Sequence, residues 1–154
     1  MSQVVFWGWR PGILTVSLIR SIREVPSYSL ADAKRFVDAL VNLPALTIEA
    51  KSPIVAKEVV AGLMRDGAYL ESRQATIRVF GCAPELHALL RTTLSSASFL
   101  PAWLSEEATT AWLLARCQPL PKPIDEVLAS ALCEQANAFG AIARVAEGPP
   151  SIRG

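Results

Sequence analysis

Cys82 and His87 are the residues whose types and spacing come closest to catalytic chemistry. A cysteine attacks as its thiolate, and a histidine nearby can accept the thiol proton. His87 is the only histidine of the chain. No third group that would orient it, and no oxyanion element, can be named from the sequence. The spacing therefore favours a structural role for both residues, and we expect a protein without enzymatic activity.

Other chemically active groups are also sparse in this sequence. The cysteines, Cys82, Cys117 and Cys133, are odd in number and widely spaced, which is typical of neither a disulfide framework nor a zinc site. We interpret them as small buried apolar residues in a reducing compartment. The acids Glu106 and Glu107 are explained by a helix start, and no glycine-rich phosphate loop is present. The sequence predicts no catalytic residue, no metal site and no cofactor.

The composition predicts a folded cytoplasmic protein. Of its 154 residues, 51% are hydrophobic, and the mean hydropathy is +0.32, so the chain can bury a sizeable core. No apolar run approaches the roughly 20 residues of a membrane-spanning helix. The net charge of +1 is far from the basic excess that nucleic-acid binding requires. We expect neither a membrane nor a nucleic acid as partner, and the apolar excess leaves room for a homo-oligomer.

The stretch from Thr15 to Asp38 predicts two amphipathic helices joined by a tight turn. Pro26 removes a backbone donor and disfavours a helical residue before it, so the first helix should end there. Ser29 then caps the second helix, with Asp32 three residues later in a variant of the capping box. The predicted apolar stripes are Leu14, Leu18, Ile22 and Val25 in the first helix, and Ala33, Phe36, Val37, Leu40 and Val41 in the second.

This helix pair resembles the one that opens the C-terminal domain of the bacterial ribosomal stalk protein. The resemblance continues to residue 73 and implies the order strand, helix, helix, strand, helix, strand. It implies an α+β fold in which helices cover one face of a small antiparallel sheet. In that family the helix pair binds translational GTPases without doing chemistry. The positions here that match its binding surface are Val16, Ile19, Arg20, Arg23 and Lys34.

The resemblance has limits at specific positions. The family usually has lysines at the positions of Thr15 and Ala31, and its Gly-Leu-Gly turn is Ser27, Tyr28 and Ser29 here. The chain also shows no dimerisation domain and no Ala- or Gly-rich hinge, the parts that tether the stalk protein. We therefore expect a protein-binding module and not a ribosomal subunit. Spacing alone, without the resemblance, would favour an ordinary solvated face for the basic residues.

The rest of the first half predicts the three strands and the third helix of the order strand, helix, helix, strand, helix, strand. Residues 4–7 and 69–73 predict flanking strands, and residues 47–49 predict a central strand. The run 56–67 predicts a third helix, with Ser52 as N-cap and Pro53 in the first turn. Gly67 suits the left-handed residue past the helix end. Alternation along the first strand places Trp7 and Trp9 on one face and Phe6 on the other.

The second half predicts an imperfect repeat of the first. Pro84 lies 73 residues after Pro11, and Gly140 lies 73 residues after Gly67. We therefore predict two tandem subdomains, residues 1–74 and 75–154. The second copy should begin with a strand at 75–80 and a helix from Pro84 that has Leu86, Leu89, Leu90 and Leu94 on one face. A helix at 108–117, capped by Ser105, and a proline-rich edge segment at 118–123 should follow. The last parts are a helix from Pro123 with Val127, Leu128, Ala131, Leu132 and Ala138 and a strand at 142–145, and Trp103 and Trp112 should lie in the core.

Two other protein classes suit the same residues. The Clp protease adaptor family shares the strand and helix order, and Ser105 to Thr109 is similar to its Ser-Glu-Glu-Ala-Thr helix start. The acidic degron-pocket signature of that family after the first strand is missing, so it ranks lower. A small bacterial immunity protein or antitoxin, which sequesters a toxin, needs only short length, no catalysis and a mixed-charge surface. The partner is therefore a protein, with a translational GTPase and a toxin as candidates.

Overall fold

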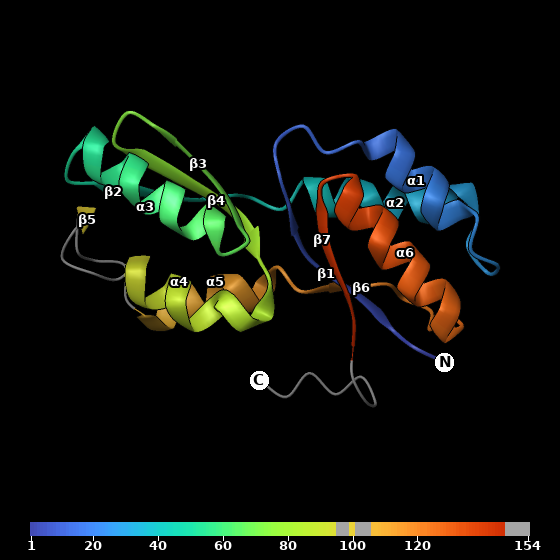
Figure 1. Cartoon of the computed structure of the whole chain (residues 1–154). Helices are drawn as coiled ribbons and strands as arrows, with labels where there is room; N and C mark the ends of the chain where they lie inside the picture. Colours follow the sequence, from blue (N-terminus) through green and yellow to red (C-terminus); the bar gives the residue numbers. More distant parts are fainter. Residues whose placement is uncertain (95–98, 101–105, 147–154) are drawn as a thin grey trace. The chain divides into compact units, whose positions relative to one another are not determined.

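The protein has an α+β fold with antiparallel strands. The computed structural model describes residues 1–94, 99–100 and 106–146 (Figure 1). The chain forms two compact units. Unit 1 combines residues 1–43 with the stretch that begins at residue 117, and unit 2 is the intervening stretch, residues 44–116.

Each unit contains β-strands and α-helices in a similar arrangement. The elements of unit 1 are β1 (Val4–Trp9), α1 (Thr15–Arg23), α2 (Leu30–Val41), β6 (Gln118–Pro119), α6 (Glu126–Ala138) and β7 (Ala141–Val145). The elements of unit 2 are β2 (Leu46–Ala50), α3 (Pro53–Arg65), β3 (Ala68–Arg73), β4 (Thr76–Cys82), a 3₁₀ turn (Pro84–Leu86), α4 (His87–Leu94), β5 (Phe99–Leu100) and α5 (Glu106–Ala115).

The compact units do not coincide with the predicted tandem subdomains. The predicted boundary between residues 74 and 75 falls in the turn between β3 and β4, inside unit 2. These two strands pair with each other from Ala68 opposite Cys82 to Arg73 opposite Thr76. Because a paired hairpin belongs to a single sheet, residues 1–74 and 75–154 are not separate units. The sequence pattern identified the elements in their chain order but assigned them to the wrong compact units.

β1 is the central strand of unit 1. Val5 and Phe6 pair with β7 and also with β6, so these two strands lie on opposite edges of β1. The proline-rich segment thus forms an edge strand, because its prolines cannot donate to a second neighbour. On the helical side, α1 packs against α2 and α6, and α2 contacts β1. The largest fully buried side chains of this core are Phe6, Leu18, Ile22, Leu40 and Leu120.

β4 has the same central place in unit 2. The residues from Thr76 to Val79 pair with β3 and with β2, and β2 pairs on its outer edge with β5. The helix α3 packs on β3, β2 and β4, and α4 packs on α5. The buried core includes Ala56, Ile77, Val79, Leu90, Leu94 and Leu113.

The central strands of the two units have the same hydrogen-bond register. Val5 of β1 lies opposite Arg144 of β7, and Arg78 of β4 lies opposite Glu71 of β3. Each of these residues is 73 positions from its counterpart in the other unit. Unit 1 therefore takes its strand-helix-helix part from the first half of the sequence and its strand-helix-strand part from the second half. In unit 2 the origins are reversed.

Both central strands carry a bulge beside a glycine. Trp7 has no partner position between the paired residues Phe6 and Gly8, and the backbone of Gly8 has φ 142°. Gly81 has φ 153° at the matching place in β4. An extra residue reverses the facing of the side chains that follow it. Trp9 consequently packs against the same core as Phe6, so the predicted placement of these two residues on opposite faces is wrong.

The predicted helix ends in the first half are confirmed. Ser29 accepts from the N–H of Asp32 at 3.1 Å, and the Ser29 N–H donates to the Asp32 carboxylate at 3.2 Å, which completes the capping box. Ser52 caps α3 by accepting from Val55, with Pro53 as the first helical residue. The serine side chains accept from N–H groups that the helix leaves unsatisfied, and Pro53 has no N–H to leave unsatisfied there.

The second half departs from prediction at two helices. Asp125, not Pro123, starts α6, because its carboxylate accepts from the N–H groups of Val127 and Leu128. Val127 is 75% exposed, and Leu89 on α4 is 46% exposed, so neither lies on the buried face as predicted. The buried positions of α6 follow the helical period as Ala129, Leu132, Cys133 and Ala136. The predicted cap Ser105 and core residue Trp103 lie outside the described residues.

Two glycine substitutions should have opposite effects on stability. We expect Gly8→Ala to lower the free energy of unfolding by roughly 1–2 kcal/mol, because alanine resists a positive φ. Gly62→Ala is the control: Gly62 lies inside α3, and an added Cβ would meet only the Arg65 side chain at 3.9 Å. This change should raise stability by about 0.5–1 kcal/mol. Urea unfolding measures both, and a stable Gly8→Ala variant would contradict the bulge.

Candidate functional site

The predicted binding residues lie on the outer surface of the α1–α2 pair. Val16, Ile19, Arg20 and Arg23 follow one another at helical spacing, so they form a stripe along α1. Val16 is 69% exposed, both arginines are exposed, and Ile19 is half-buried against the core. Lys34 is exposed on α2, and no hydrogen bond or ion pair of the described residues joins it to this stripe. The stripe combines apolar side chains in its first half with positive charge in its second half.

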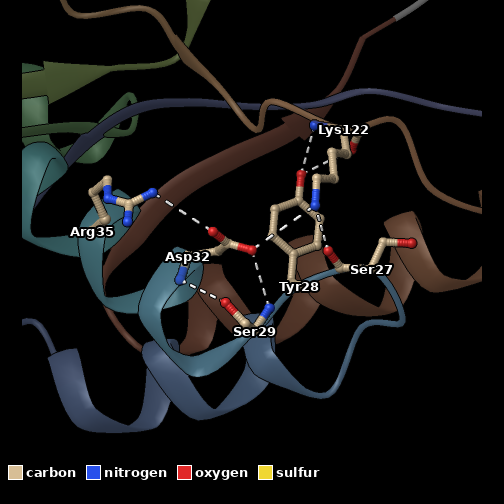
Figure 2. Close-up of polar contacts among 6 residues, drawn as sticks. All are labelled: Ser27, Tyr28, Ser29, Asp32, Arg35 and Lys122. Carbon is tan, nitrogen blue, oxygen red and sulfur yellow. Dashed lines mark hydrogen bonds and ion pairs between the residues drawn. The ribbon is translucent and has the colours of Figure 1, made fainter.

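The turn between these two helices is contacted by Lys122, which lies 94 positions further along the chain than Tyr28. Figure 2 shows the Lys122 side chain reaching over Tyr28 towards Ser27 and Asp32. The Tyr28 hydroxyl donates to the Lys122 carbonyl at 2.9 Å and accepts from the Lys122 N–H at 2.7 Å. The Lys122 ammonium donates to the Ser27 carbonyl at 2.7 Å and lies 5.5 Å from the centre of the Tyr28 ring. Tyr28 thereby joins the turn to the edge segment of unit 1.

Asp32 lies where the turn and the start of α2 meet. Its carboxylate accepts from the Ser29 N–H and lies 3.6 Å from Arg35 and 3.9 Å from Lys122 (Figure 2). The hydrogen bonds from Ser29 lower the pKa of Asp32, and the positive charges of Lys122 and Arg35 act in the same direction. The carboxylate is therefore charged at neutral pH and balances part of the positive charge at this turn.

The sequence gives no signal for the contact between Tyr28 and Lys122. The two residues are 94 positions apart, and their bonds use the backbone of Lys122 and not a recognisable side-chain motif. In the sequence, only the difference between Ser27, Tyr28 and Ser29 and the Gly-Leu-Gly turn of the stalk proteins, which the helix pair was compared with, marked this turn as unusual. Ser27 has φ 83°, a conformation that favours glycine, while its carbonyl accepts from Lys122.

Cys82 and His87 are poorly suited to nucleophilic chemistry. Cys82 is fully buried, and burial together with the charge of Glu85 raises the pKa of its thiol to about 12. The thiol therefore stays protonated at neutral pH, whereas a nucleophile needs the thiolate. Burial also lowers the pKa of His87 despite a hydrogen bond to the Cys82 backbone. Cys82 belongs to the buried core of unit 2, and His87 lies half-buried.

Arg116 is a buried charged residue that the sequence analysis did not single out. Only 2% of it is exposed, and it donates to the carbonyls of Phe80 and, at 2.5 Å, Pro44. Its guanidinium carbon lies 4.5 Å from the centre of the Trp112 ring. Burial lowers its pKa to about 10, so it remains charged at neutral pH. Within the described part of the chain no carboxylate pairs with it, and backbone carbonyls take that role.

The helix pair of unit 2 does not repeat the basic stripe. A shallow hollow of about 510 Å³ lies between α4 and α5, and its lining includes Arg91, Glu107, Thr110 and Leu114. The Arg91 guanidinium donates to the Thr110 hydroxyl at 3.2 Å, so it is engaged within this helix pair. The hollow thus has one acid and one base, whereas the α1 stripe has only positive charge.

Comparison of the chain with known protein families, curated proteins and solved structures found no similar protein. Among the described residues, none of the helices is both long enough and apolar enough to span a membrane. The same residues contain no cluster of three or more histidine, cysteine or acidic side chains placed to hold a metal ion.

Removal of the Tyr28 hydroxyl should weaken the fold of unit 1. We expect Tyr28→Phe to lower the free energy of unfolding by about 1–2 kcal/mol, because two hydrogen bonds to Lys122 are lost together. Tyr69→Phe is a matched control, since the half-buried Tyr69 lies in β3 of unit 2. Its effect should stay within about 0.5 kcal/mol. Equal urea midpoints for the two variants would contradict a structural role for the contact with Lys122.

The charge of Asp32 should contribute to stability only above acidic pH. Its pKa is lowered in the folded state, so in the unfolded state it binds a proton at higher pH, near its ordinary value of about 4. The stabilisation is therefore present above that pH and is lost as the pH falls through the folded-state pKa. Asp32→Asn should destabilise the protein more at pH 6 than at pH 2.5.

Asp38→Asn, an exposed substitution further along α2, is the control for this measurement. Its effect should not change in the same way between the two pH values, because Asp38 makes no side-chain bond among the described residues. Denaturant unfolding of the three proteins at both pH values gives the comparison. A constant difference between wild type and Asp32→Asn would show that the cap does not depend on charge.

Proposed function

We propose that this protein is a non-catalytic binding module whose unit 1 binds a protein partner through the outer surface of α1 and α2. The observation that carries the proposal is the α1 stripe, in which the strongly exposed Val16 is followed by Arg20 one turn later and by Arg23 at the helix end, on one helical face. Leu14 and Leu30, at the starts of α1 and α2, are 54% and 53% exposed. Exposed aliphatic residues next to positive charge are typical of a surface that another protein covers.

The resemblance to the ribosomal stalk domain supports the same surface. The resemblance rests on the sequence of the helix pair, and the residues that match the binding surface of that domain include Val16, Arg20 and Lys34. The capping box and the turn position these two helices by contacts that leave the stripe uncovered. The family's partner, a translational GTPase, is one candidate for this chain.

The chemistry of the stripe defines the kind of partner. Arg20, Arg23 and Lys34 favour a partner with an acidic surface, because complementary charge accelerates encounter. The apolar side chains of Val16 and Ile19 then supply the contact from which water is excluded. We therefore expect the complex to form more slowly at high ionic strength, since salt screens exposed charges over about 10 Å.

The test compares two variants with wild type in affinity capture followed by mass spectrometry. The first replaces Arg20, Arg23 and Lys34 with alanine, and the second is Val16→Asp. Both should lose a partner that wild type retains, by at least about tenfold in captured amount if roughly 1.4 kcal/mol is lost. Melting temperature is measured in parallel, and it should change little because the substituted side chains are exposed.

The controls match the variants in charge and exposure. Lys51, Lys57 and Arg73, which are exposed in unit 2, are replaced with alanine, and Val127→Asp changes a residue that is 75% exposed on α6. Capture should survive in both controls. If wild type and the α1 variants retain the same proteins, the surface is not a binding site. A large fall in melting temperature would instead assign the stripe to the fold.

A further inference from the structure

The two halves of the sequence supply interchangeable parts to the two units. In the structure β1 pairs with β7 and β4 pairs with β3, with registers that differ by a constant 73 positions. The same registers would allow β1 to pair with β3, and β4 with β7, if each half of the chain closed on itself. We call the pairing in the structure, β1 with β7 and β4 with β3, the exchanged closure. We call the alternative pairing, β1 with β3 and β4 with β7, the sequential closure.

The buried faces of the packing helices match as closely as the strands. Ala56 of α3 and Ala129 of α6 are both fully buried, and Val60 and Cys133 are both 8% exposed. Each pair again lies 73 positions apart. Cores accept such aliphatic exchanges when volume and pattern are kept. The interfaces themselves therefore distinguish weakly between the two closures.

The connection between β3 and β4, in contrast, strongly favours the exchanged closure over the sequential closure. Arg73 and Thr76 pair across the hairpin, which leaves only Gln74 and Ala75 in the turn. A turn of two residues can join only adjacent antiparallel strands, whereas sequential closure would place β3 and β4 in different units. We propose that this short turn selects the exchanged closure, and that each half of the chain retains the ability to close on itself.

Cysteine pairs on the exposed face of the strands report which closure is present. Glu71 and Arg78 lie opposite each other in the structure, so Glu71→Cys with Arg78→Cys should form a disulfide in the exchanged closure. In the sequential closure Arg78 would face Arg144 instead, so Arg78→Cys with Arg144→Cys reports that state. Peptide mapping by mass spectrometry identifies each link and separates it from the native cysteines.

The decisive variant replaces Gln74 and Ala75 with a Gly/Ser segment of about 12 residues, which spans roughly 20 Å as a flexible coil. Closure probability falls as about the 3/2 power of loop length, so the exchanged closure should be disfavoured roughly 15-fold relative to the native turn. Both cysteine pairs are introduced, one at a time, into the native-turn and long-turn chains. Each protein is refolded from denaturant at low concentration, oxidised mildly, and analysed in its monomeric fraction.

We expect the native turn to give the 71–78 link alone, and the long turn to add the 78–144 link. The proposal is overturned if the long-turn chain forms only the 71–78 link or no longer folds. A further control, Arg116→Leu with the native turn, removes the buried contact to Pro44, a side-chain contact that joins the two halves of the sequence only in the exchanged closure. If that change alone produces the 78–144 link, the buried arginine and not the turn selects the closure.

Discussion

The pairing of β3 with β4 is the constraint on which the arrangement of the rest of the chain depends. A turn of two residues places the end of the first half of the sequence beside the start of the second half. β4 then takes β3 and β2 as its neighbours, and β1 takes β7 and β6. The result is two similar units, each of which combines strands from both halves of the sequence. Folding of either unit therefore needs both halves of the chain.

Arg116 shows how this arrangement is accommodated inside unit 2. It directly follows α5, and only 2% of it is exposed. An unpaired buried charge is costly, but the two carbonyls and the Trp112 ring supply partial negative charge. Because Pro44 and Arg116 are the first and last residues of unit 2, their hydrogen bond joins both ends of that unit.

The surface proposed for binding is separate from these internal contacts. Tyr28, Lys122 and Asp32 form bonds at the turn, while Val16 and Arg20 remain exposed along α1. The polar contacts define the angle at which the chain enters α2, and the exposed stripe makes no such contribution. This division of roles is typical of a module whose scaffold is rigid and whose recognition residues can change without loss of the fold.

The local elements and the global arrangement differ in how far the sequence alone determines them. The capping box at Ser29, the start of α3 at Ser52, and the apolar stripe of α2 were predictable, because each depends on residues within a few positions of one another. The α+β class followed from the same local signals. The start of α6 was misassigned because Asp125 competed with Pro123 as a start signal only two residues away.

The tertiary structure alone decided which half of the chain completes which unit. Strand pairing between β1 and β7 depends on backbone hydrogen bonds, and nearly any pair of apolar strands satisfies their pattern. The bonds from Tyr28 to Lys122 and from Arg116 to Pro44 likewise end on backbone groups, which every residue has. Such contacts leave no residue-specific mark in the sequence. The local sequence therefore determined the elements, and long-range backbone pairing determined their partners.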